Sequence, residues 1–114
     1  MHVVIESTSP VSEARRLLAN VVVREALGIL AKHIESVRFR LPAVGGGERA
    51  RCELEVQLTS GAKLECDGTA DSMADAFEGA AHEMRRRMFA ELGLPLPARS
   101  RHADADAAAE RRAT

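Results

Sequence analysis

Two runs of alternating apolar and polar residues, separated by Thr-Ser-Gly, constrain the fold of this chain more than any other feature. They occupy residues 51–58 and 62–67, and such alternation is typical of β-strands with one buried face. A two-residue turn would place Leu58 opposite Lys63 and mix the buried face with the solvent face. A three-residue loop pairs Leu58 with Ala62 instead and puts Gly61 at a left-handed position. The sequence therefore predicts a β-hairpin with a three-residue loop.

The predicted register also locates the two cysteines of the chain. Cys52 falls opposite Gly68 and diagonally from Cys66, at roughly 7–8 Å, which is too far for a relaxed disulfide. We expect both cysteines to be reduced and to point into the core. Because this layout brings no histidine within reach of either thiol, thiol catalysis is not expected.

Two further strands are predicted at HVVIES (residues 2–7) and within SVRFRLPAV (residues 36–44). The second alternates, so that Arg38 and Arg40 point away from the apolar side chains between them. Together with Arg51 they decorate the open face of the sheet, which they share with four acidic residues. We expect cross-strand ion pairs there, with Glu53, Glu55, Glu65 and Asp67 as the acidic partners.

Two helices are predicted between and after the strands. Ser9 as N-cap and Pro10 at the first helical position favour a helix that runs to about Ile34. A second helix is expected from the capping residue Ser72 to Gly93. The first helix is apolar over an unusually wide arc. Its core-facing stripe is predicted to be Leu18, Val22, Ala26, Ile29 and Leu30, and the remaining apolar residues, expected on the outer side, are Leu17, Val21, Val23 and Leu27.

The resulting order, β-α-β-β-β-α, predicts an α+β fold. The first β-α-β unit makes strands one and two parallel, and the hairpins add two antiparallel strands. With one apolar face per sheet and one stripe per helix, a two-layer sandwich follows: a four-stranded mixed sheet with two helices on one face. We expect this domain to span residues 1–94 and residues 95–114, which are small, polar and alanine-rich, to form a flexible C-terminal tail.

Composition excludes several classes of function. The 114-residue chain has a formal net charge of −1, three Phe, no Trp and no Tyr, which argues against stacking of bases on an aromatic platform. The four histidines are scattered, and the acidic residues around the start of the second helix match no Ca²⁺ loop. We therefore expect no catalytic residues, no metal, no cofactor and no small-molecule substrate. Without a signal peptide or an apolar run of about 18 residues, no membrane association is expected and a cytoplasmic location is the default.

The segment LEVQLTSGAKLECDGTADSMADAFEGAAHEMRRRM (residues 54–88) resembles the ribosome hibernation promoting factors, also called ribosome-associated inhibitors or sigma-54 modulation proteins. In that family a hairpin with Gly in its turn leads into a capped helix of the form M-x-x-A-[IF]-[DE]-x-x-x-x-x-[LM]-x-R-x-[LM]. The matching residues here are Met73, Ala76, Phe77, Glu78, Met84, Arg86 and Met88. In the order of elements, the resemblance extends from residue 2 to about residue 92.

The resemblance implies a non-enzymatic protein that binds ribosomal RNA on the small ribosomal subunit and keeps ribosomes inactive. A chain of this length resembles the short form of the family, which lacks a dimerisation domain. The basic residues on the predicted helices are the expected RNA contacts: Arg86, then Arg85 and Arg87, and on helix one Arg15, Arg16, Arg24 and Lys32. Helical geometry places Arg86 fully in water opposite the buried Met84 and Met88, whereas Arg85 and Arg87 flank the apolar stripe and can lay their stems over it. Glu83 stands where the family is often basic.

A second hypothesis stays open beside the ribosomal one. The outer apolar residues of helix one, Leu17, Val21, Val23 and Leu27, could dock a partner protein or a second copy of the chain, giving a homodimer. Exposed apolar patches of this kind mark interfaces. Under this hypothesis the protein is an interaction module of the same fold that does not bind RNA.

Overall fold

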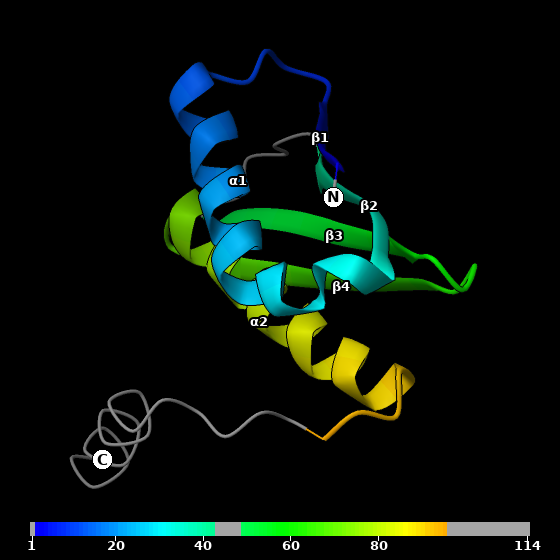
Figure 1. Cartoon of the computed structure of the whole chain (residues 1–114). Helices are drawn as coiled ribbons and strands as arrows, with labels where there is room; N and C mark the ends of the chain where they lie inside the picture. Colours follow the sequence, from blue (N-terminus) through cyan, green and yellow to red (C-terminus); the bar gives the residue numbers. More distant parts are fainter. Residues whose placement is uncertain (1, 43–48, 96–114) are drawn as a thin grey trace, which may run out of the picture.

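The computed structural model describes residues 2–42 and 49–95 and shows a two-layer α+β sandwich (Figure 1). The four strands lie in the order β1-β2-β3-β4, with β1 parallel to β2 and the other neighbours antiparallel. The predicted tail lies outside the described residues apart from Pro95. The elements are β1 (His2–Ser7), α1 (Glu13–Leu27), a 3₁₀ helix η1 (Gly28–His33), β2 (Ile34–Leu41), β3 (Ala50–Leu58), β4 (Lys63–Ala70) and α2 (Met73–Glu91).

The β3–β4 hairpin has the predicted three-residue loop. The amide of Leu58 donates to the carbonyl of Ala62 at 2.8 Å, and the amide of Gly61 donates to the carbonyl of Leu58 at 2.9 Å. Gly61 has φ +96°, in the left-handed region that glycine adopts without a steric penalty. The pairing of Cys52 with Gly68 follows from the same register and is confirmed.

Helix α2 begins and ends as its sequence predicts. The Ser72 hydroxyl accepts a hydrogen bond from the amide of Asp75 at 3.1 Å. At the other end Gly93 has φ +66°, and the amide of Leu94 donates to the carbonyl of Phe89 at 2.9 Å. This pattern is a Schellman motif, in which glycine relieves the strain of the left-handed turn.

Helix α1 is shorter than predicted at both ends. Its N-cap is Ser12, whose hydroxyl accepts from the amide of Arg15 at 3.1 Å, so the prediction of Ser9 as the cap was wrong. Both serines satisfy the local rule, and Ser12 gains Glu13 in the first turn, where the helix dipole favours an acidic side chain. The α-helix ends at Leu27 and the chain continues as a 3₁₀ helix from Gly28, because glycine weakens an α-helix at that point.

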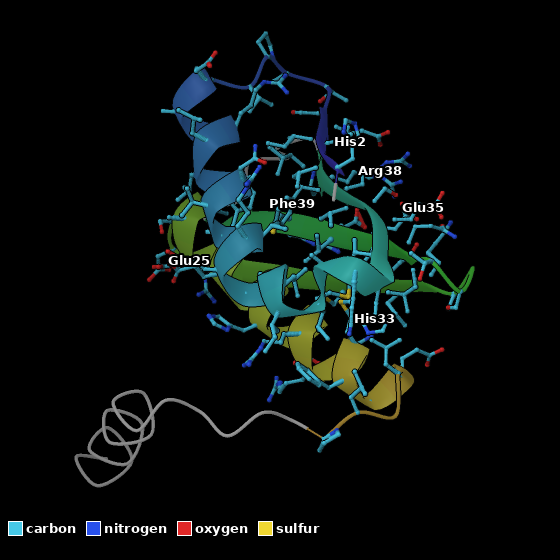
Figure 2. All side chains as sticks on the ribbon, viewed as in Figure 1. His2, Glu25, His33, Glu35, Arg38 and Phe39 are labelled. Atoms are coloured by element: carbon cyan, nitrogen blue, oxygen red, sulfur yellow. The ribbon has the colours of Figure 1, made fainter. Side chains whose placement is uncertain are left out.

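The core lies between the sheet and the two helices. The Phe39 ring on β2 packs against the Phe77 ring on α2 with centroids 4.7 Å apart, and Figure 2 shows Phe39 between the layers, with Arg38 on the opposite side of β2. Both cysteines are free and buried, as predicted. Their thiols donate to backbone carbonyls of α2, Cys52 to Ala76 at 3.4 Å and Cys66 to Ala80 at 3.1 Å.

The outer face of α1 differs from the prediction. Val23 and Leu27 are completely buried in the core, so their assignment to an exposed partner surface was wrong. Leu17 and Val21 are exposed, by 58% and 50%. The buried stripe is rotated relative to the predicted one and includes the small residue Ala19, which is fully buried. Ile29, expected in the core, lies in η1 with 62% of its surface exposed.

Candidate nucleic-acid interface

The three consecutive arginines of α2 occupy three different environments. The guanidinium carbon of Arg85 lies 5.5 Å from the ring centroid of Phe89, within range of a cation–π interaction. Nη1 of Arg87 donates to the backbone carbonyl of Glu65 on β4 at 2.9 Å. Arg86 makes neither kind of contact, and 68% of its side chain is exposed. Arg86 is therefore the member of the trio with the most freedom to reach a ligand.

Arg86, which helical geometry predicts to lie in water, nevertheless has an ion-pair partner on its own helix. The Glu83 carboxylate forms ion pairs with Nη2 of Arg86 and, at 3.3 Å, with Nε of Arg87. Hydrogen bonds from Arg86, the larger cause, and from Arg87 hold the pKa of Glu83 below its usual value. The spacing of three and four residues on one helix is the signal that would have predicted these pairs.

The other predicted basic residues lie on α1 and η1. Arg15 and Arg16 are in the first turns of α1, Arg24 in its last turn and Lys32 in η1, and all four are exposed. Within residues 2–42 and 49–95, no ion pair involves any of them. Together with Arg86 and Arg87 of α2 they offer exposed cationic groups on the helix layer of the molecule, whereas Arg85 is half-buried.

These cationic groups are not continuous across the helix layer. A hollow of about 140 Å³ lies between α1 and α2 and is lined by Val22, Glu25, Ala26, Glu78 and His82. Figure 2 shows Glu25 on the side of α1 next to α2. Two carboxylates here repel phosphates, so the geometry favours contacts at the C-terminal half of α2 and at the ends of α1 over contacts in the valley between the helices.

The open face of the sheet carries the predicted cross-strand ion pairs in part. Glu55 and Asp67 pair with arginines and Glu6 is a partner that was not predicted, whereas Glu53 and Glu65 form no ion pair among the described residues. Arg38 pairs with Glu6 at 3.4 Å and with Glu55 at 3.5 Å, and Arg51 pairs with Asp67 at 3.6 Å. A hydrogen bond from Lys63 is the main cause of a lowered pKa for Glu55. Since cations and carboxylates are matched across strands, this face has little attraction for a polyanion.

The described residues contain no reactive thiol and no metal-binding cluster. Burial raises the pKa of the Cys52 thiol to about 12 and that of Cys66 to about 11, so both are protonated at neutral pH and are poor nucleophiles. Throughout residues 2–42 and 49–95, no group of three His, Cys, Asp or Glu side chains is arranged to hold a metal ion. No helix in the same ranges is long and apolar enough to span a membrane.

Comparison with known proteins identifies the fold. The sequence matches no family model and no curated protein. Among solved structures, the chain is similar to a ribosomal subunit interface protein from Coxiella burnetii, with a TM-score of 0.70 and 14% identity over 82% of this chain and 99% of that one. It is also similar to the N-terminal domain of Protein Y from Thermus thermophilus, with a TM-score of 0.59 and 15% identity over 76% and 94% of the two chains. The chain therefore has the fold of a ribosomal subunit interface protein.

Proposed function

We propose that this protein is a ribosome-associated factor that binds the small subunit and helps to keep ribosomes inactive. The observation that carries the proposal is the shared fold with a ribosomal subunit interface protein, which extends over 99% of that protein's chain. The exposed arginines and lysine on α1, η1 and α2 are the side chains suited to ribosomal RNA, because guanidinium groups form charge-assisted hydrogen bonds with phosphates.

Arg86 is the principal contact in this proposal. It is exposed, it lies on the helix layer, and its only described ion pair is with a surface carboxylate. Its neighbours have other contacts, Arg85 with the Phe89 ring and Arg87 with the β4 backbone. Binding is expected to be electrostatic and to weaken steeply as salt is raised, since each neutralised phosphate releases counterions.

Co-sedimentation with purified small subunits over a series of salt concentrations tests the proposal. Arg86→Ala should leave the free energy of unfolding within about 0.5 kcal/mol and weaken binding. Adding Arg16→Ala should flatten the log–log salt dependence by roughly 1.4–1.8, the contribution of two phosphates. Addition of the wild-type protein to a cell-free translation reaction should lower its yield.

Arg51→Ala is the matched control, because it removes the same charge from the open sheet face, where Arg51 is similarly exposed. It should bind like the wild type. An equal loss in the Arg51 and Arg86 variants would show that net charge, not the helix layer, governs binding. Failure of the wild type to sediment with small subunits even at low salt would refute the ribosomal function.

One observation favours a second function. Leu17 and Val21 lie one turn apart on α1 and are about half exposed or more, which suits docking of a partner protein or of a second copy. Leu17→Gln with Val21→Gln should weaken such docking and, because the charge of α1 is unchanged, leave RNA binding intact. Analytical ultracentrifugation of the wild type and this double variant separates the two functions.

A further inference from the structure

We propose that Glu83 is an intramolecular competitor of RNA phosphates for Arg86, so that binding of a phosphate requires exchange of one anionic partner for another. The inference rests on the proposed function, which supplies RNA phosphate as the ligand. It assigns to Glu83 a role in setting the affinity of the site, separate from the residues that contact RNA.

The first step of the argument is the arrangement of Glu83 between Arg86 and Arg87. The two carboxylate oxygens of Glu83 are used separately, Oε2 by Arg86 and Oε1 by Arg87. A phosphate presents oxygen acceptors of the same kind to the same guanidinium donors. Only 34% of the Glu83 side chain is exposed, against 68% for Arg86 and 52% for Arg87, so the arginines remain accessible from solvent while Glu83 holds them.

The second step is the asymmetry between the two arginines. Arg87 also donates to the Glu65 carbonyl at 2.9 Å, which keeps it against the sheet. Glu83 is the only partner of Arg86 in the described structure. When Arg86 turns toward a phosphate, Glu83 therefore keeps Arg87 as a partner, and the exchange leaves no carboxylate without a cation.

The third step is the strength of the ion pairs that Glu83 forms. Exposed ion pairs three or four residues apart on a helix are weak and are screened by salt. Competition from Glu83 should therefore reduce the affinity for phosphate by a modest factor, not prevent binding. A phosphate brought close by several other cations displaces Glu83, whereas an isolated phosphate does so poorly. The group formed by Glu83, Arg86 and Arg87 thus favours extended polyanions over single phosphate groups.

The test compares Glu83→Gln with Glu78→Gln. Both variants remove one negative charge from α2, and within the described residues Glu78 forms no ion pair. Binding is measured to a 20-nucleotide oligouridylate by fluorescence anisotropy and to small subunits by sedimentation. At low salt we expect Glu83→Gln to tighten oligonucleotide binding by about two- to fivefold and Glu78→Gln by less than about 1.5-fold.

A double-mutant cycle with Arg86→Ala supplies the second readout. In the Arg86→Ala background, Glu83→Gln should gain no more than Glu78→Gln does, because the arginine that Glu83 holds is gone. Equal gains from the two glutamate variants, persistence of the Glu83 gain without Arg86, or no oligonucleotide binding by Glu83→Gln would each overturn the inference. If the oligonucleotide results are as expected and the wild type does not sediment with small subunits, the inference stands and the ribosomal function falls.

Discussion

Among the glycines that the structure describes, Gly68 on β4 is the one where an added methyl group should disturb the fold most. A Cβ placed there would lie 3.0 Å from both the carbonyl carbon of Ala76 and the amide nitrogen of Ala80, and closer still to the Ala76 carbonyl oxygen. These atoms belong to the backbone of α2, so no side-chain rotation can relieve the overlap. Gly68→Ala must therefore push the helix away from the sheet.

The expected cost follows from that displacement. Carbon atoms in good contact are about 3.5–4.0 Å apart, so α2 must move by at least about 0.5 Å and by more near the carbonyl oxygen. Overpacking of a core costs about 1–3 kcal/mol, and a clash with backbone belongs at the upper end. The alanine also restricts the unfolded chain, which offsets about 0.4–1 kcal/mol. We expect a net loss of about 2–2.5 kcal/mol, and at 4–8 °C per kcal/mol a melting temperature lower by roughly 8–20 °C.

Thermal and urea unfolding followed by circular dichroism measure this loss. Gly79→Ala is the matched control, since Gly79 lies on the exposed side of the same helix and a Cβ there meets nothing within 4 Å. It should stabilise the protein by about 1 kcal/mol, the difference in helix propensity between glycine and alanine. An unchanged or raised melting temperature for Gly68→Ala would refute the close approach of α2 to β4.

Two further predictions concern the core. Leu27→Ala should lower the free energy of unfolding by about 2–5 kcal/mol and Leu17→Ala by no more than about 0.5 kcal/mol, because Leu27 is buried and Leu17 is exposed. Similar losses for the two variants in urea unfolding would mean that the buried face of α1 is assigned wrongly. Cys52 and Cys66 should resist iodoacetamide at pH 8 until the protein unfolds. Rapid labelling of the native protein would contradict the burial of the thiols. The pKa values of the thiols in the folded protein, about 12 and about 11, lie above the ordinary value of 9.0. The free energy of unfolding should therefore fall as pH rises above about 9, where only the thiols of the unfolded chain ionise.

The strands could be predicted from the sequence because their pattern leaves few choices. With a side-chain period of two, the only question at the β3–β4 hairpin was parity, and the pairing of Leu58 with Ala62 was the one that kept all apolar residues on one face. The caps of α2 were equally direct, since Ser72 and Gly93 are each the obvious residue for their position.

The start and the buried face of helix α1, and the contacts of the three arginines, were predicted less accurately than the strands, for different reasons. Ser9 and Ser12 both qualify as caps, and the local difference between them, Glu13 in the first turn after Ser12, is weak beside the Pro10 that favours Ser9. A helix that is apolar over most of its circumference does not reveal which side is buried, so Val23 was placed outside the core. For Arg86, the sequence predicted exposure correctly. Its spacing from Glu83 also allows an ion pair, but the spacing alone does not say whether Glu83 pairs with Arg86, with Arg87 or with both.

The hydrogen bond from Arg87 to Glu65 has a consequence for the solubility of the protein. β4 is an outer strand of the sheet, and the backbone of such a strand is a template on which another chain can add a strand and start aggregation. Glu65 faces Glu55 across the hairpin. The Arg87 guanidinium donates a hydrogen bond to the backbone carbonyl of Glu65. A charged side chain from the helix layer thus takes one hydrogen-bond acceptor of this edge, which should disfavour edge-to-edge association.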